Sequence, residues 1–114
     1  MNFIHKEQKG WHIFEVHGEL SFSAISEVDE LGNEVKSLIK KGEYRFIFDL
    51  TDVPFIDSSG IAIVIMAMSI ALKNGKPIKI CGLQKEPANS FNIIKVDFGI
   101  KNYHTLDEAL ADAD

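Results

Sequence analysis

The 114-residue sequence contains one cysteine, one arginine and no apolar run long enough to cross a membrane. A single cysteine, Cys81, excludes an internal disulfide and a thiolate metal cluster. With Arg45 as the only arginine and a formal net charge of -5, the chain has no basic stripe to neutralise a series of phosphates, so we expect no nucleic-acid partner. The longest mainly apolar run, residues 61–72, is shorter than the roughly 18 residues of a transmembrane helix. We therefore expect no direct membrane insertion.

Sequence signals for secretion, metal binding and catalysis are also missing. The first residues lack a basic segment followed by an apolar core, which predicts no secretory signal and a cytoplasmic location. Glycines do not gather in a phosphate-binding loop, and no Gly-x-Ser-x-Gly elbow surrounds Ser58. The histidines include no pair at helical spacing that would indicate a metal site: His5, His12, His17 and His104. We expect a non-enzymatic protein without cofactor or metal.

The composition, 46% hydrophobic and 25% charged, is that of one soluble domain over residues 1–114. Apolar patterns predict strands over residues 2–7, 11–17, 44–50, 78–81 and 100–103. Helical periodicity and capping signals predict helices over about 25–39, capped by Ser21 or Ser23, then 59–73, 87–98 and 105–113. This order predicts a single α/β domain: an N-terminal hairpin with residues 8–10 as its turn, then mainly parallel strands, in a mixed four- to five-stranded sheet with about four helices.

Residues 55–60, Phe-Ile-Asp-Ser-Ser-Gly, lie where a strand ends and an apolar helix begins. Taken alone, the run from Asp57 to Ser59 predicts an ordinary helix N-cap, and Gly60 would let the backbone of another protein come close. A phosphate on Ser58 would meet free N–H groups and the positive end of the helix dipole, while Asp57 would oppose it by charge repulsion. This segment is the candidate functional site.

The helix that follows carries two apolar rows. Its core stripe is Ile61, Val64, Ile65, Met68 and Leu72. A second row, displaced around the helix, consists of Ile63, Met66 and Ile70. This second row fits either a docking face or burial between neighbouring elements, and both interpretations stay open.

Four segments across the chain resemble the STAS domains of bacterial anti-sigma factor antagonists: Gly18-Glu19-Leu20, Phe48-Asp49-Leu50, residues 53–61 and Ile80-Cys81-Gly82-Leu83. The resemblance implies that Ser58 is phosphorylated by a serine-protein kinase that is also an anti-sigma factor. The unphosphorylated chain would bind this kinase and release the sigma factor, and a phosphatase would reset Ser58. The residues expected to form the switch loop and the partner contact are Asp57, Ser59, Gly60, Ile63, Met66, Ile70, Glu19 and Ser21. The family often has an acidic residue where this chain has Ser21.

Two other functions remain open. One is a constitutive STAS subunit or scaffold of a transporter or a stress-sensing complex, in which the loop makes a permanent contact without a phosphorylation switch. The other is a small nucleotide-binding module.

Overall fold

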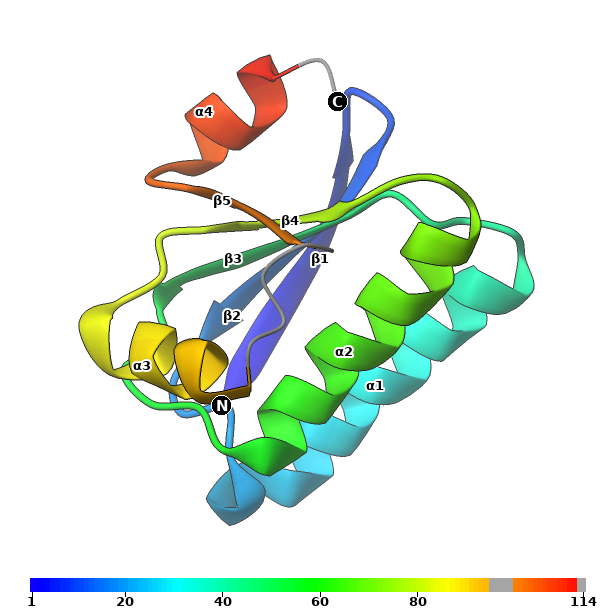
Figure 1. Ribbon diagram of the computed structural model, residues 1–114. Helices are drawn as coiled ribbons and strands as arrows, with labels where there is room; N and C mark the ends of the chain where they lie inside the picture. The colour runs from blue at the N-terminus through cyan, green and yellow to red at the C-terminus, as the bar shows by residue number, and fades with distance from the viewer. Residues whose placement is uncertain (95–99, 113–114) are drawn as a thin grey trace.

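The computed structural model describes residues 1–94 and 100–112, which form one α/β domain (Figure 1). Its sheet contains β1 (Asn2–Gln8), β2 (Trp11–His17), β3 (Phe46–Asp52), β4 (Ile78–Cys81) and β5 (Ile100–Tyr103). Its helices are a short 3-10 helix, η1 (Phe22–Ala24), and α1 (Ile25–Lys40), α2 (Ser58–Lys73), α3 (Lys85–Ile94) and α4 (Leu106–Ala111). The strands lie in chain order, with β1 antiparallel to β2 and the other neighbours parallel. The predicted mixed sheet is confirmed.

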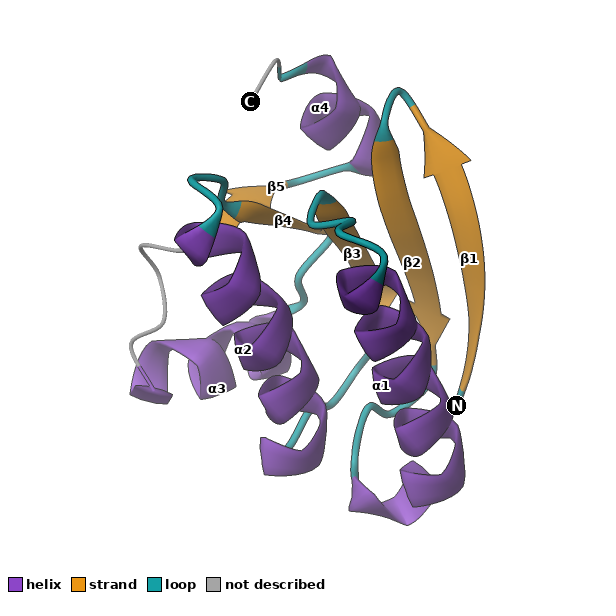
Figure 2. Ribbon diagram, turned by 90° about the vertical axis from the view of Figure 1, so that its right-hand side faces the viewer, coloured by secondary structure: helices purple, strands orange, loops and turns teal. Residues whose placement is uncertain are grey.

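The two faces of the sheet are covered by different helices, because successive side chains of a strand point to opposite faces. Phe14 and Phe48 lie on one face with their ring centroids 5.8 Å apart, in the large core that α1 and α2 cover. Ile13 and Ile47 lie on the other face, where Leu110 of α4 packs in a second cluster. Figure 2 shows α1 and α2 side by side on their face, and α4 apart from them.

Lys79 is a charged residue in the middle of the second cluster and has no exposed surface. Its Nζ donates hydrogen bonds to the backbone oxygens of Ala109, at 2.6 Å, and of Asp112, at 2.8 Å. The same Nζ lies 4.4 Å from the centroid of the Trp11 ring. Lys79 therefore ties the end of α4 to the sheet by hydrogen bonds and a cation–π contact.

Local details differ from the sequence-based predictions. The hairpin turn has two residues, not three, because Lys9 and Gly10 both adopt positive φ and Gln8 pairs with Trp11. Neither Ser21 nor Ser23 caps α1; η1 intervenes, and the N-cap position is Ala24. The third strand begins at Phe46 rather than residue 44. The predicted end of the third helix, near residue 98, lies outside the described residues.

Candidate functional site

The loops that leave β2 and β3 meet at one edge of the sheet. Leu20 and Ile56 form a parallel bridge. The N–H of Leu20 donates to the backbone oxygen of Phe55 at 3.0 Å, and the N–H of Asp57 donates to that of Leu20 at 3.3 Å. Neighbouring parallel strands end at the same edge, so these loops form a single surface. We call residues 19–22 and 55–60 the switch surface.

Asp57 holds the two loops of the switch surface together. As the N-cap of α2, its Oδ1 accepts a hydrogen bond from the N–H of Ser59 at 2.9 Å. Its Oδ2 accepts one from the N–H of Phe22, also at 2.9 Å. These bonds, from Phe22 first and then from Ser59 and Gly60, keep the pKa of Asp57 below its ordinary value, although partial burial acts in the opposite direction. One carboxylate therefore joins the start of η1 to the start of α2.

Ser58 is exposed as the first residue of α2, whereas Ser59 is partly buried. The position of Ser58 makes its hydroxyl accessible to a second protein. The N–H groups at the start of α2 are not all free, because Oδ1 of Asp57 already accepts a hydrogen bond from that of Ser59, and the expectation of free N–H groups around a phosphate needs this correction. A phosphate on Ser58 would have to share these donors with a neighbouring carboxylate of like charge.

Gly60 belongs to the residues expected to form the switch loop, and its surroundings show why a glycine is needed there. It is buried, and a Cβ built on it would lie 2.4 Å from the backbone oxygen of Leu20 and 2.9 Å from Cγ1 of Ile56. The missing side chain makes room for the neighbouring loop of the same chain, not for the backbone of a partner. Gly60 therefore lets Leu20 and Ile56 pack closely against the first turn of α2.

The other expected contact residues of the loop differ in accessibility. Glu19 is exposed, but Ser21 is buried, and its Oγ lies 2.8 Å from Oγ of Ser23. Ser21 therefore orders the loop rather than offering its side chain to a partner. The sequence analysis did not predict Phe22 and included Phe55 only as part of the segment 55–60, yet both side chains are exposed on the switch surface. An aromatic residue in each loop is the sequence feature that could have indicated this pair. The two loops are far apart in sequence, however, and only the fold brings them together.

The residues of the second apolar row of α2 differ in burial, so the two interpretations left open apply to different residues. Ile63 is buried, and its Cγ1 lies 3.6 Å from the Cβ position at Gly32 of α1, so α1 covers it. A direct partner contact by Ile63 is therefore wrong. Met66 and Ile70 are half-buried, and their part in docking stays a prediction.

The described part of the chain also bears on metal binding and membrane insertion. Within residues 1–94 and 100–112, no three histidine, cysteine, aspartate or glutamate side chains are arranged to hold a metal ion. Across the same residues, every helix is too short or too polar to span a bilayer. His5 and His12 do lie together, with Nε2 of His5 2.9 Å from Nδ1 of His12, but they belong to β1 and β2 rather than to the switch surface.

The bonds to Asp57 predict a pH dependence of stability. Because the pKa of Asp57 is lowered in the folded chain, its carboxylate stabilises the fold above about pH 4, and this contribution is lost as the pH falls through the folded pKa. We expect the stability of Asp57→Asn to depend less on pH between pH 5 and 2 than that of the parent, as measured by urea unfolding. The matched control is Thr105→Ala, which removes the uncharged cap of α4. Equal pH slopes for the parent and Asp57→Asn would contradict the assignment.

Comparisons with known proteins identify the fold. The STAS domain family model matches residues 2–109. A putative anti-sigma factor antagonist from Thermotoga maritima is 19% identical, with 95% of this chain and 91% of that chain covered and a TM-score of 0.83. The phosphorylated form of SpoIIAA, a Bacillus cell fate determinant, is 18% identical over 95% and 96% of the two chains, with a TM-score of 0.75.

A sulfate transporter family protein from Wolinella succinogenes is also similar, at 19% identity over 93% of this chain and 86% of that chain, with a TM-score of 0.68. A search of curated proteins found no match. At these identities the structural likeness establishes the fold alone. The family model spans nearly the whole sequence, and this chain therefore belongs to the STAS domain family.

Proposed function

We propose that this chain is an anti-sigma factor antagonist whose binding to a serine-protein kinase anti-sigma factor is controlled by phosphorylation of Ser58. The unphosphorylated chain binds the kinase and frees the sigma factor, and a phosphatase restores this state. The observation that carries the proposal is the placement of Ser58, which is exposed at the first position of α2. The resemblance to anti-sigma factor antagonists supports the choice of partner.

Phosphorylation would act on partner binding through charge. A phosphoserine carries about -1.5 to -2 charges at pH 7 and would stand beside the carboxylate of Asp57. A partner surface matched to a neutral hydroxyl would have to desolvate this charge without pairing it, which costs several kcal/mol. The chain itself needs no catalytic group, because the kinase supplies the nucleotide, the metal and the base.

A second candidate is a permanent STAS subunit without a phosphorylation switch. The similarity to a sulfate transporter family protein favours it. It predicts a complex whose formation does not respond to ATP or to the state of Ser58.

Phosphate mapping and binding measurements test the switch. We expect peptide mass spectrometry of the protein isolated from cells in two growth states to find phosphate on Ser58, at an occupancy that changes with state. Ser58→Ala should abolish the modification and keep binding to the copurified kinase, whereas Ser58→Glu should weaken binding about 100-fold, as expected for an unpaired charge that costs a few kcal/mol.

Two matched controls separate position from charge. Ser37→Glu places the same charge on an exposed residue of α1, outside the switch surface and the second apolar row, and should leave kinase binding unchanged. Ser59→Ala should leave the phosphate on Ser58. Unmodified protein in both growth states, together with normal binding by Ser58→Glu, would reject the switch and favour the permanent subunit.

A further inference from the structure

Two phenylalanines of the switch surface are exposed to solvent. Phe22 in η1 is 69% exposed, and Phe55 in the loop after β3 is 43% exposed. Among the described residues, the other large hydrophobic side chains with this degree of exposure are Ile4 and Leu72. Aromatic side chains that bury a large area at small entropic cost are frequent anchors of protein interfaces. We call Phe22 and Phe55 the aromatic pair.

The backbone under each member of the aromatic pair is fixed. The N–H of Phe22 is bonded to Asp57, and the backbone oxygen of Phe55 accepts the N–H of Leu20 at 3.0 Å. The aromatic pair and Ser58 therefore belong to one hydrogen-bonded framework. A preorganised pair loses less entropy on binding than side chains on loose loops would.

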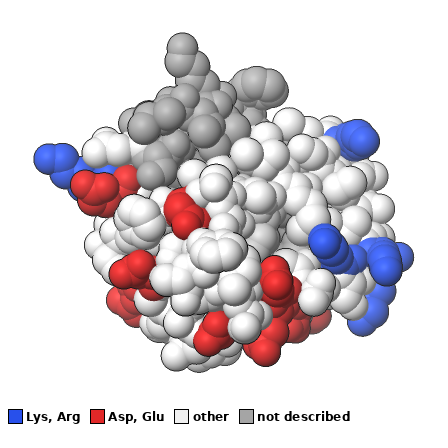
Figure 3. Space-filling view, turned by 90° about the horizontal axis from the view of Figure 1, so that it is seen from below, with Lys and Arg blue, Asp and Glu red and all other residues white. Residues whose placement is uncertain are grey.

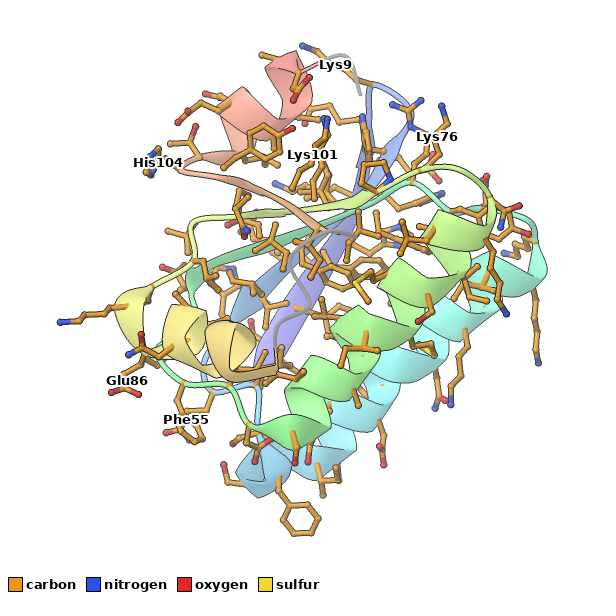
Figure 4. All side chains as sticks on the ribbon, viewed as in Figure 1. Lys9, Phe55, Lys76, Glu86, Lys101 and His104 are labelled. Atoms are coloured by element: carbon orange, nitrogen blue, oxygen red, sulfur yellow. The ribbon has the colours of Figure 1, made fainter. Side chains whose placement is uncertain are left out.

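The charge around the aromatic pair has one sign. Residues 18–35 and 46–72, which include both loops of the switch surface, contain aspartates and glutamates but no lysine or arginine. Figure 3 looks onto this end of the molecule and shows acidic side chains spread around an uncharged middle, with lysines toward the sides. In Figure 4, Phe55 lies at the same end as Glu86, whereas Lys9, Lys76 and Lys101 lie toward the other end. The aromatic pair is thus surrounded mainly by negative charge.

We propose that Phe22 and Phe55 anchor the chain in an apolar pocket of its partner, and that lysines and arginines rim this pocket. The inference rests on the proposed function, because it assigns the chemistry by which the same partner recognises the surface around Ser58. A second copy of the chain is a poor occupant, since self-association through this surface would place acidic residues against acidic residues. A basic partner gains both apolar burial and charge complementarity.

The geometry also links docking to the switch. A partner that covers Phe22 and Phe55 also comes close to Ser58, because Asp57 joins the segment of Phe22 to the first turn of α2 and Phe55 precedes Ser58 by three residues. Phosphorylation would then put a dianion inside the docked surface, where the partner has to desolvate it. Charges at the centre of an interface are desolvated, whereas charges at its rim stay hydrated.

Photo-cross-linking in cells identifies the partner protein, which is then used in the binding measurements. A photoreactive phenylalanine analogue is placed at position 22 or 55, with position 4 of β1 as the control, since Ile4 is also exposed, at 50%. We expect positions 22 and 55 to capture the same basic protein and position 4 not to capture it. The captured protein is identified by mass spectrometry, expressed and purified for binding measurements.

Binding to the purified partner then measures each anchor. Phe22→Ala and Phe55→Ala should each weaken binding by about 30-fold, the loss expected for an interface hot spot. Ile4→Ala and Leu72→Ala should bind as the parent does. Raising the salt concentration should weaken binding of the parent, because ions screen the attraction between the acidic residues around the aromatic pair and the basic rim of the partner's pocket. Circular dichroism should show that every variant is folded, since both phenylalanines are exposed.

The outcomes separate this inference from the proposed switch. Normal binding by both phenylalanine variants, with loss of binding in Ser58→Glu, would overturn the anchors and leave the switch intact. Loss of binding in the phenylalanine variants, with normal binding by Ser58→Glu, would support the anchors and reject the switch. Cross-links between two copies of this chain, or the absence of cross-links from positions 22 and 55, would overturn the inference.

Discussion

Replacing Gly60 by alanine is expected to lower the free energy of unfolding by about 3 kcal/mol, the upper part of the range for overpacking a buried site. The new Cβ would lie 2.4 Å from the backbone oxygen of Leu20, 2.6 Å from Cγ of the same residue and 2.9 Å from Cγ1 of Ile56. The backbone of Leu20 cannot yield cheaply, because it forms the bridge to Ile56 and accepts the N–H of Asp57. The loss should exceed the gain in helix propensity that alanine brings.

Gly32→Ala is the matched control for Gly60→Ala. Gly32 is also a buried helical glycine, but its Cβ would meet only the side chain of Ile63, at 3.6 Å. This is an ordinary van der Waals distance, so we expect no loss, or a gain of about 0.5–1 kcal/mol from helix propensity. Urea unfolding followed by circular dichroism and by the fluorescence of Trp11 measures both variants. Equal stability of the two would show that the loops of the switch surface are not closely packed on α2.

Lys79→Ala is expected to lower the free energy of unfolding by about 4 kcal/mol. It removes the buried aliphatic part of the side chain and the ammonium group that donates hydrogen bonds to two backbone carbonyls. Those carbonyls, of Ala109 and Asp112, lie at the end of α4. Lys79→Met, which keeps most of the volume, should lose about 2 kcal/mol, because it removes the two hydrogen bonds and the cation–π contact with Trp11. Limited proteolysis should cut both variants faster near α4 than it cuts the parent.

The control for Lys79 is Lys76→Ala, which removes an exposed lysine just before β4 and should change stability by less than about 0.5 kcal/mol. A buried cation can sometimes be replaced by an apolar residue without loss, because the chain no longer has to desolvate a charge. If Lys79→Met matched the parent in stability and in proteolysis, the ammonium group would not be what holds α4.

The sequence was sufficient to predict the strands and helices, because each carries its own pattern. Apolar side chains on both faces, as in Phe46-Ile47-Phe48, indicate an inner strand, and the residues around Ser58 indicate the start of a helix, as found in β3 and α2. The antiparallel hairpin followed from the short turn ending in Gly10, and the parallel order after it followed from the alternation of strands and helices. These are local signals, and local signals survive folding when packing does not oppose them.

The features that depend on distant segments could not be predicted. Phe22 and Asp57 are joined by a hydrogen bond across 35 residues of sequence, and Gly60 is required because of Leu20. Lys79 lies between the apolar residues Ile78 and Ile80 of β4, a pattern that predicts a solvent-exposed lysine side chain. In the structure α4 covers that face of the sheet. The second apolar row of α2 was ambiguous for the same reason, because its environment is set by α1.

The order of the strands has a consequence for how the domain is built during synthesis. Each strand pairs only with the strands that come directly before and after it in the chain. The sheet can therefore grow one strand at a time from the N-terminal hairpin, and no strand has to wait for a distant one to be inserted beside it. The switch surface is formed by the loops after β2 and β3 and the first turn of α2, so its two loops can meet while the part of the chain after α2 is still on the ribosome.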